Sequence, residues 1–251
     1  MNRTETHEII RQVGIVPAVR VSTAEEAHFA AEAVCSGGIP IVEITLTVAR
    51  AVELIAHLAH YHPKTVVGAG TVLNTELAQK CLDAGASFLT SPGLNLKVVE
   101  FAAKNQIAVL PGALTPTEVI AAWEAGPDFV KIFPCADVGG ERYIRDLHAA
   151  LPQIPLIAAG GVNQQTAGTY ILAGATAIGV GHELIPPEAI ERRQAKRIKE
   201  LSVRFAGFVK AARERIEPPR EVAVGKFKKI EECETDEASP AKPAHKGNGQ
   251  R

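Results

Sequence analysis

A lysine and a glutamate stand in two apolar segments, where charged side chains are costly to bury. Lys131 lies in DFVKIFP, residues 128–134, and Glu43 lies in IVEITLT, residues 41–47. Because burial disfavours the ammonium form, desolvation should depress the pKa of Lys131 and give a neutral amine that can attack a ketone. The alternative is an ion pair between Lys131 and Glu43 with no chemical role. The two residues therefore predict either an amine nucleophile with a carboxyl partner or a purely structural pair.

Alternation along the strands predicts which of these side chains share a face, since successive strand residues point to opposite sides. The apolar residues on either side of Glu43 would face outward, which leaves Glu43, Thr45 and Thr47 on an inward, polar face. The same pattern leaves Lys131 and Phe133 inward. Once an iminium forms on Lys131, cleavage of the adjacent carbon–carbon bond needs a base for the released hydroxyl, and Glu43 is the nearest candidate. A purely structural hydrogen bond to a neighbouring threonine is the alternative for Glu43.

A recurring unit from Ile15 to about Gly181 must position these residues. Each unit has a short apolar run, a turn, an amphipathic stretch and a glycine stop of the kind that ends a helix. The units predict eight strands, in the segments IVPAVRV, IVEITLT, TVVGAG, SFLTSP, IAVLP, DFVKIF, PLIAA and AIGVG. Eight alternating units favour an α/β fold of the (β/α)8 or TIM-barrel type, with an extra N-terminal helix. A doubly wound open sheet is the structural alternative.

The composition fits one large domain followed by a tail. A barrel of this type often occupies roughly 250 residues, and the chain has 251, of which 46% are hydrophobic and 5% aromatic. We expect residues 1–216 to form the barrel domain. Residues 217–251 are rich in Pro, Gly, Lys and Glu and poor in apolar side chains, which predicts a disordered tail. A short docking segment around 222–227 is the alternative for that tail.

Charge and cysteine content exclude several classes of partner. The formal net charge of −1 gives no basic excess for nucleic acid or an anionic membrane, so we expect a small-molecule partner. Four cysteines without a CxxC pair predict no disulfide framework, and no His, Asp and Glu have the spacing of a metal site, so we expect neither a metal nor another cofactor. A polar N-terminus and the lack of an 18-residue apolar run favour a cytoplasmic protein without a membrane partner.

Glycine-rich motifs end three of the predicted strands. Those at 159–162 and 179–182 belong to the loops after the seventh and eighth strands, where barrels commonly bind phosphate through backbone N–H groups. His182 would add charge to that site or be a plain loop residue. Thr71 ends the motif at 68–71 and could hold a substrate carboxylate. Arg20 is the best cationic partner for that carboxylate through bidentate geometry, with a salt bridge at the barrel rim as its alternative.

Taken together, these motifs resemble one family of class I pyruvate aldolases, the 2-keto-3-deoxy-6-phosphogluconate and 4-hydroxy-2-oxoglutarate aldolases. The resemblance covers about residues 15–186. It rests on VEITL (42–46), VGAGTVLN (67–74), SPG (91–93), LPGALTPTE (110–118), FVKIFP (129–134), AAGGV (158–162) and IGVG (178–181).

The resemblance implies a homotrimeric barrel that cleaves a 2-keto-3-deoxy sugar acid, phosphorylated at C6, to pyruvate and an aldehyde such as glyceraldehyde 3-phosphate. It implies that Lys131 is the Schiff-base lysine and Glu43 the acid–base residue. The substrate-binding residues that it implies are Thr71, Pro92, Phe133, Gly160 and Gly161. To these the residues themselves add Arg20, Thr47, Gly181 and His182 as candidates.

The chain departs from the family pattern at three positions. Thr47 stands where some members have an arginine, and Arg20 is then an alternative carboxylate anchor. Ala159 and His182 replace a threonine and a serine whose hydroxyls would face the phosphate in many members. The aldehyde half of the substrate therefore stays open, with 4-hydroxy-2-oxoglutarate or an unphosphorylated 2-oxo acid as alternatives.

Two further interpretations remain at this point. Another phosphate-binding barrel, such as an isomerase or synthase, would keep the glycine loops but would not need the inward lysine. A non-catalytic scaffold or a sensor of 2-oxo acids would bind pyruvate without turnover.

Overall fold

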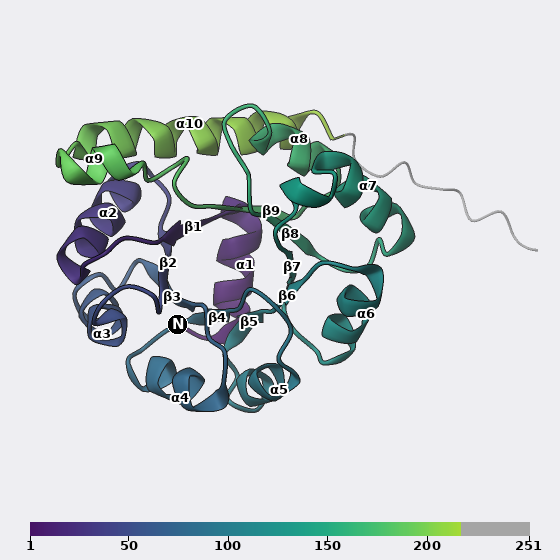
Figure 1. Ribbon diagram of the computed structural model, residues 1–251, viewed down its shortest axis with the longest axis horizontal. Coiled ribbons are helices and arrows are strands. Elements are labelled where there is room, and N and C mark those ends of the chain that lie inside the picture. The colour runs from purple at the N-terminus through teal and green to yellow at the C-terminus, as the bar shows by residue number, and fades with distance from the viewer. Residues whose placement is uncertain (217–251) are drawn as a thin grey trace, which may run out of the picture. The chain divides into compact units, whose positions relative to one another are not determined.

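Parallel strands alternate with helices through residues 1–216, the part of the chain that this computed structural model describes (Figure 1). The predicted tail, residues 217–251, lies outside the described residues. The strands are β1 (Ile15–Val19), β2 (Ile41–Thr45), β3 (Val66–Gly70), β4 (Phe88–Thr90), β5 (Ala108–Leu110), β6 (Gly112–Ala113), β7 (Val130–Ile132), β8 (Leu156–Ala159) and β9 (Ala177–Val180).

One parallel ladder joins all these strands in the order β5-β4-β3-β2-β1-β9-β8-β7-β6. β5 and β6 are two parts of one extended segment, interrupted at Pro111, which has no N–H to give to the ladder. β5 pairs with β4, and β6 pairs with β7, so the ring of strands closes through residues 108–113. The predicted (β/α)8 barrel is confirmed, and the described residues form nine strands rather than eight because of this break.

Helices surround the ring of strands (Figure 1). The α-helices are α1 (Arg3–Val13), α2 (Ala24–Ser36), α3 (Ala51–Tyr61), α4 (Thr75–Asp83), α5 (Leu96–Lys104), α6 (Pro116–Glu124), α7 (Glu141–Ala150), α8 (Ala167–Leu172), α9 (Pro187–Glu191) and α10 (Ala195–Glu214), and a 3-10 turn, η1, covers Ala136–Val138. The predicted N-terminal helix is thus present as α1. Among residues 1–216, no helix is long and apolar enough to cross a membrane.

Side-chain caps fix where several helices begin. Asn2, Thr23 and Thr115 each accept a hydrogen bond from a backbone N–H in the first turn, and a glutamate three residues later bonds back to the cap. These capping boxes satisfy N–H groups that have no partner inside the helix. The chain therefore turns from strand to helix at defined residues, which sets the direction in which each strand presents its side chains.

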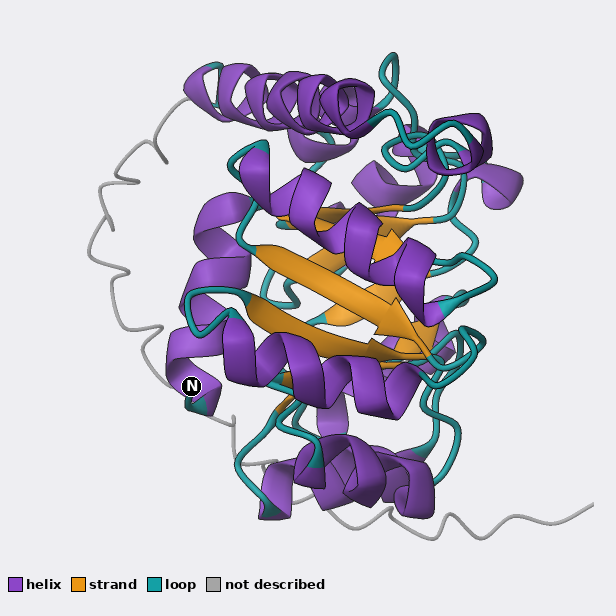
Figure 2. Ribbon diagram, turned by 90° about the vertical axis from the view of Figure 1, so that its left-hand side faces the viewer, coloured by secondary structure: helices purple, strands orange, loops and turns teal. Residues whose placement is uncertain are grey.

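The strands all point toward the same end of the barrel, as the arrowheads in Figure 2 show. Val42 and Ile44 of β2 and Val130 and Ile132 of β7 are fully buried, as expected for side chains packed between strands and helices. The alternate residues of the same strands point into the barrel. This confirms the predicted alternation and leaves the carboxyl ends of the strands free to carry polar groups.

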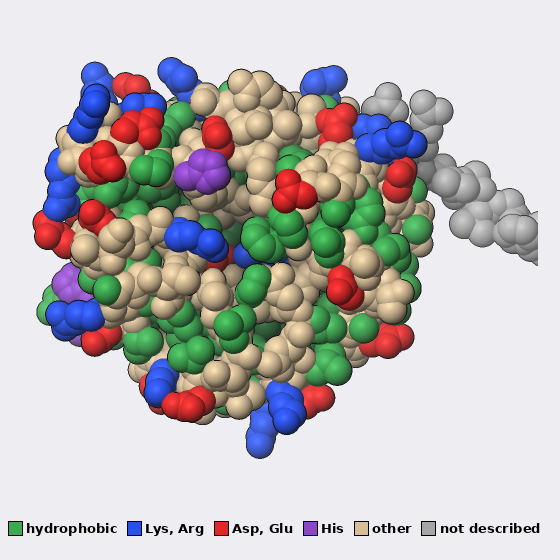
Figure 3. Space-filling model, viewed as in Figure 1, with side chains coloured by type: hydrophobic (Ala, Val, Ile, Leu, Met, Phe, Trp, Pro, Cys, Tyr) green, Lys and Arg blue, Asp and Glu red, His purple; other side chains and the backbone are tan. Residues whose placement is uncertain are grey.

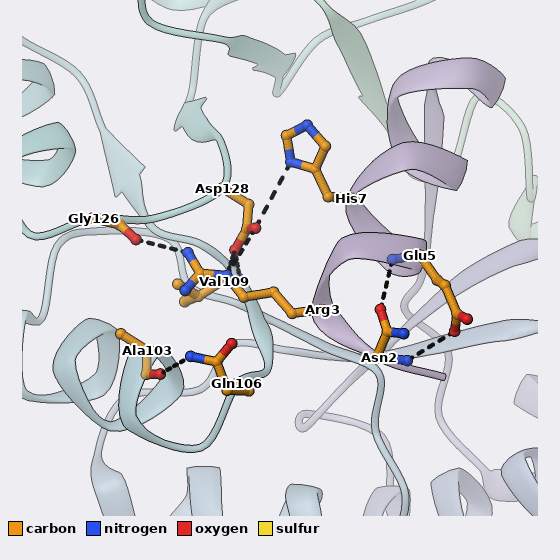
Figure 4. Close-up of polar contacts among 9 residues, drawn as sticks. All are labelled: Asn2, Arg3, Glu5, His7, Ala103, Gln106, Val109, Gly126 and Asp128. Carbon is orange, nitrogen blue, oxygen red and sulfur yellow. Dashed lines mark hydrogen bonds and ion pairs between the residues drawn. The ribbon is translucent and has the colours of Figure 1, made fainter.

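The amino-terminal end of the barrel is covered by α1 (Figures 1 and 2). Arg3 of α1 donates from Nε to the Asp128 carboxylate at 3.0 Å and from Nη2 to the carbonyl of Gly126 at 2.8 Å (Figure 4). The same carboxylate accepts the backbone N–H of Val109 at 3.0 Å, and its side chain is 7% exposed. Asp128 thus ties α1 to both β5 and the segment that leads into β7.

Replacing Asp128 by alanine should destabilise the barrel, because the Arg3 guanidinium and the Val109 N–H would lose their shared acceptor. We expect a loss of about 1–3 kcal/mol in the free energy of unfolding, the usual cost of leaving buried polar groups unpaired. Urea unfolding of the variant and of wild type measures this difference in the free energy of unfolding. The control is Glu8→Ala, which removes a solvent-exposed pair with Arg11 on the same helix and should leave the midpoint unchanged. Equal stability of Asp128→Ala and wild type would contradict the assignment.

Candidate active site

A cavity of about 290 Å³ opens at the carboxyl ends of the strands. Figure 3 shows the hollow in the middle of this face, with basic side chains beside it. Its walls are formed by Val16, Ala18, Arg20, Glu43, Thr90, Leu110, Lys131, Phe133, Ile157, Ala159, Gly160, Gly161, Val162, Gly179, Gly181, His182 and Glu183. Most of this wall is apolar, so the few charged groups that reach it are set in a poorly hydrated environment.

Lys131 and Glu43 meet inside this cavity from β7 and β2. The Lys131 Nζ lies 3.8 Å from Glu43 Oε2, and the two side chains are 14% and 5% exposed. That separation exceeds hydrogen-bond length, so a substrate hydroxyl placed beside both groups could bond to each. The Nζ also lies 5.5 Å from the centre of the Phe133 ring, which limits hydration of the amine on that side.

Gly70 makes room for the Glu43 carboxylate. A Cβ at Gly70 would stand 2.1 Å from Glu43 Oε1, far inside van der Waals contact. Glu43 pairs in register with Ala18 of β1 and Gly68 of β3, so small neighbours flank it on both sides. Within the 68–71 motif, Gly70 therefore makes room for the Glu43 carboxylate of the adjacent strand, and Gly68 makes room for the Phe88 ring of β4.

The two glycine loops predicted to bind an anion lie at the end of the cavity near β8 and β9. Gly160, Gly161 and Gly181 all line it, and Gly160 and Gly161 have φ angles of +85° and +80°, which only glycine adopts easily. A Cβ at Gly161 would meet Ala136 at 2.3 Å. His182 follows on the rim with a side chain that is 77% exposed. The structure thus brings together the two loops that the sequence predicted.

Arg20 lies on the rim of the cavity just beyond β1. Within residues 1–216 its guanidinium makes no ion pair or hydrogen bond with another residue. The salt bridge that was the structural alternative for Arg20 is therefore not seen among the described residues. An unpaired guanidinium at the mouth of an apolar cavity is suited to a bidentate contact with a carboxylate.

Three predicted binding residues do not line the cavity. Thr47 is exposed beyond the end of β2, and its hydroxyl lies 3.0 Å from that of Thr45. Thr71 follows the last residue of β3 with a φ of +64°, and Pro92 lies on the surface with its carbonyl against Gly112. Strand alternation does not extend past the last paired residue, so the expected direction of these side chains is not fixed by the ladder.

Thr90 is a cavity residue that the sequence interpretation missed. It is 1% exposed, and its Oγ1 has no hydrogen-bond partner among residues 1–216. A buried hydroxyl without a partner is costly, so one that faces a cavity is well placed to bond a ligand. The alternation rule, applied to the segment SFLTSP, would have found it.

Cys135 follows β7 but has no reactive environment. Its thiol is buried and donates to the carbonyl of Gly160 at 3.3 Å. Burial raises the pKa of the Cys135 thiol, which keeps the sulfur protonated and a poor nucleophile. Its role is to pack the loop after β7 against the loop after β8.

Known proteins resemble this chain in sequence and in fold. The sequence model of the KDPG and KHG aldolase family matches residues 6–201. The KHG/KDPG aldolase of Escherichia coli (strain K12) is 31% identical over 201 residues, which cover 80% of this chain and 94% of that relative.

Two solved structures extend the comparison. The KDPG aldolase of Legionella pneumophila, with pyruvate captured as a covalent carbinolamine intermediate, is 28% identical with a TM-score of 0.74, covering 79% of this chain and 96% of that one. The 2-keto-3-deoxy-6-phosphogluconate aldolase of Zymomonas mobilis ZM4, solved with 3-phosphoglycerate, is 27% identical with a TM-score of 0.74, covering 82% and 97%. The chain therefore belongs to the KDPG and KHG aldolase family of carbon–carbon lyases.

Proposed function

We propose that this protein is a class I aldolase that cleaves 2-keto-3-deoxy-6-phosphogluconate to pyruvate and glyceraldehyde 3-phosphate through a Schiff base on Lys131. The observation that carries the proposal is the Lys131 amine 3.8 Å from the Glu43 carboxylate in an apolar cavity at the catalytic end of a barrel. The covalent carbinolamine of pyruvate in the Legionella relative supports the same chemistry.

The reaction begins when the neutral Lys131 amine attacks the C2 ketone. The carbinolamine takes a proton from Glu43 and loses water to give an iminium, and this cation draws the electron pair of the C3–C4 bond toward C2. The C4 hydroxyl gives its proton to Glu43 as the bond breaks and the aldehyde leaves. Glu43 then returns a proton to C3 of the enamine, and water hydrolyses the resulting iminium to release pyruvate and restore Lys131.

The rest of the cavity holds the two ends of the substrate. Arg20 binds the C1 carboxylate, with Thr90 as a further donor to the pyruvate half. The family resemblance assigns Thr71 and Pro92 to the same half, and Thr47 stands where some members have an arginine. All three would act from beyond the strand ends. Residues Gly160, Gly161, Gly181 and His182 bind the phosphate, and the 3-phosphoglycerate bound to the Zymomonas relative supports a phosphorylated ligand.

The enzyme's domain, cellular location, oligomeric state and partners can be proposed as well. We infer that residues 1–216 form the aldolase domain and that the protein works in the cytoplasm as a homotrimer, without a nucleic-acid or membrane partner. The near-neutral charge and the family resemblance support this. Its working partner is a small 2-oxo acid, and its chemistry runs on the side chains of the barrel without a cofactor.

Borohydride reduction in the presence of pyruvate tests the Schiff base. We expect one pyruvate adduct per chain, located on Lys131 by peptide mass analysis, because reduction converts the iminium to a stable secondary amine. Lys131→Met should give no adduct and no cleavage. Lys97→Met, at an exposed lysine on α5, is the matched control and should be labelled like wild type. An adduct that persists in Lys131→Met would overturn the assignment.

Glu43→Gln separates binding of pyruvate from proton transfer. The amide has the shape of the carboxylate but cannot take the C4 hydroxyl proton, so cleavage should slow by about two to four orders of magnitude. Borohydride trapping of pyruvate should persist, which shows that the cavity is intact. Steady-state cleavage of the phosphorylated substrate measures the rate. A rate equal to that of wild type would remove Glu43 from its role.

The phosphate site is tested with two substrates that differ only at C6. Wild type should cleave the 6-phosphorylated acid with a kcat/KM at least about tenfold above that of the unphosphorylated acid, since charge-assisted hydrogen bonds are the stronger ones. His182→Ala should lower the kcat/KM of the phosphorylated acid alone, by about two- to fivefold, because its exposed side chain is screened by water. Equal kcat/KM for both acids in wild type would mean that these loops bind no phosphate.

A further inference from the structure

Two histidines and a glutamate converge on the outside of the barrel, away from the aldolase cavity. They are His28 and Glu32 of α2 and His62, the residue that ends α3. One ligand atom from each lies within 4.8 Å of the other two. None of the three lines the cavity that holds Lys131. The sequence did not predict this cluster, because the third member comes from a different helix.

Helix geometry explains how the cluster forms. His28 and Glu32 are four residues apart on α2, so their side chains stand on one face, with His28 Nδ1 3.6 Å from Glu32 Oε2. α2 and α3 lie side by side on the barrel (Figure 1). The His62 ring reaches His28 across this gap, with the ring centres 5.9 Å apart. A simple ion pair within α2 would not need this third group.

The backbone that carries His62 is held in place against α2. The His62 N–H donates to the carbonyl of Leu58, and its own carbonyl accepts the N–H of Thr65 at 2.8 Å. The Thr65 hydroxyl in turn lies 3.6 Å from the Cys35 sulfur on α2. The position of His62 relative to α2 is therefore fixed by contacts outside the cluster, which lowers the cost of organising a site.

The side chains themselves keep room to adjust. His28 is 31% exposed and Glu32 54% exposed, and within residues 1–216 Glu32 has no cationic partner besides His28. Ligands bonded to a tetrahedral zinc at about 2.0–2.1 Å stand about 3.4 Å apart. Rotation of partly exposed side chains closes the difference from 4.8 Å without moving either helix.

We infer that His28, Glu32 and His62 form a binding site for a divalent transition-metal ion of the zinc type. Two imidazoles and one carboxylate are ligands that suit Zn²⁺, and three protein ligands leave a fourth position for water. His57 stands edge-on to His28, with ring centres 5.1 Å apart, but it is outside the set of three. The bound ion joins α2 to α3 and stabilises the folded chain, because it binds the folded state in preference to the unfolded one.

Zinc titration of the full chain tests the site. Isothermal titration calorimetry with Zn²⁺ alone should find one ion bound per chain, and the same ion should raise the thermal unfolding midpoint. His28→Ala, His62→Ala and Glu32→Gln should each weaken this binding by at least about tenfold, since loss of even an outer-shell partner weakens metal sites by that much. Each variant should lose the zinc-dependent rise in the midpoint while it keeps the metal-free midpoint of wild type.

His60→Ala is the matched control, because His60 is an exposed histidine of α3 that is not in the cluster. It should bind zinc as wild type does. The chain also contains Cys233 and His245, so zinc binding by itself does not identify the ligands. Binding that is unchanged in all three cluster variants would place the ion elsewhere and overturn the inference, as would a wild type that binds no zinc. Glu32→Gln keeps the shape of the side chain, so its result does not depend on a change in folding.

Discussion

Closure of the strand ring through residues 108–113 is the constraint on which the rest of the structure depends. Pro111 cannot donate to the ladder, yet its carbonyl accepts the N–H of Lys131 at 2.9 Å, so the ring stays joined at the break. This bond sets the height of Lys131 in the barrel. On the other side of β7, the pairings through β8, β9 and β1 fix the register of β2, where Glu43 pairs with Ala18 and Gly68. Lys131 and Glu43 are far apart in sequence, and they meet because strand pairing fixes the register of both β7 and β2.

The electrostatics of the proposed reaction follow from that meeting. Two charges in an apolar cavity are tolerated only when they lie close together, and removal of one leaves the other unpaired. The iminium intermediate is also a cation at the position of the Lys131 nitrogen. The Glu43 carboxylate therefore faces a positive charge once the iminium has formed, and it already lies where that charge develops. The same carboxylate can take the hydroxyl proton because it does not hydrogen-bond Lys131 directly at 3.8 Å.

Sequence alone could predict those features that depend on strand alternation and on the glycines that end helices. Glu43, Lys131 and Phe133 were placed correctly in the cavity because each lies in or next to a paired strand. Thr47 was not, because β2 ends at Thr45 and the backbone turns beyond it. Thr71 was not, because Gly68 and Gly70 are the residues of β3 that share the inward face of Glu43. The break between β5 and β6 arises because Pro111 has no N–H, and the apolar pattern of the segment does not predict it. Contacts between neighbouring helices, such as that of His62 with α2, depend on tertiary packing, which residue spacing in the sequence does not predict.

The inferred metal site and the aldolase site lie on opposite sides of one strand. α2 and α3 both pack against β2, which presents Glu43 to the cavity on its inner face. An ion that joins these helices would restrain the outer support of β2 without touching a group that reacts. A misplacement of about 1 Å in a reacting group can cost a hundredfold in rate. Holding α2 and α3 in place against β2 would therefore help to keep Glu43 in its reactive position. The outer layer of helices can thus acquire a stabilising site while the inner chemistry of the barrel is unchanged.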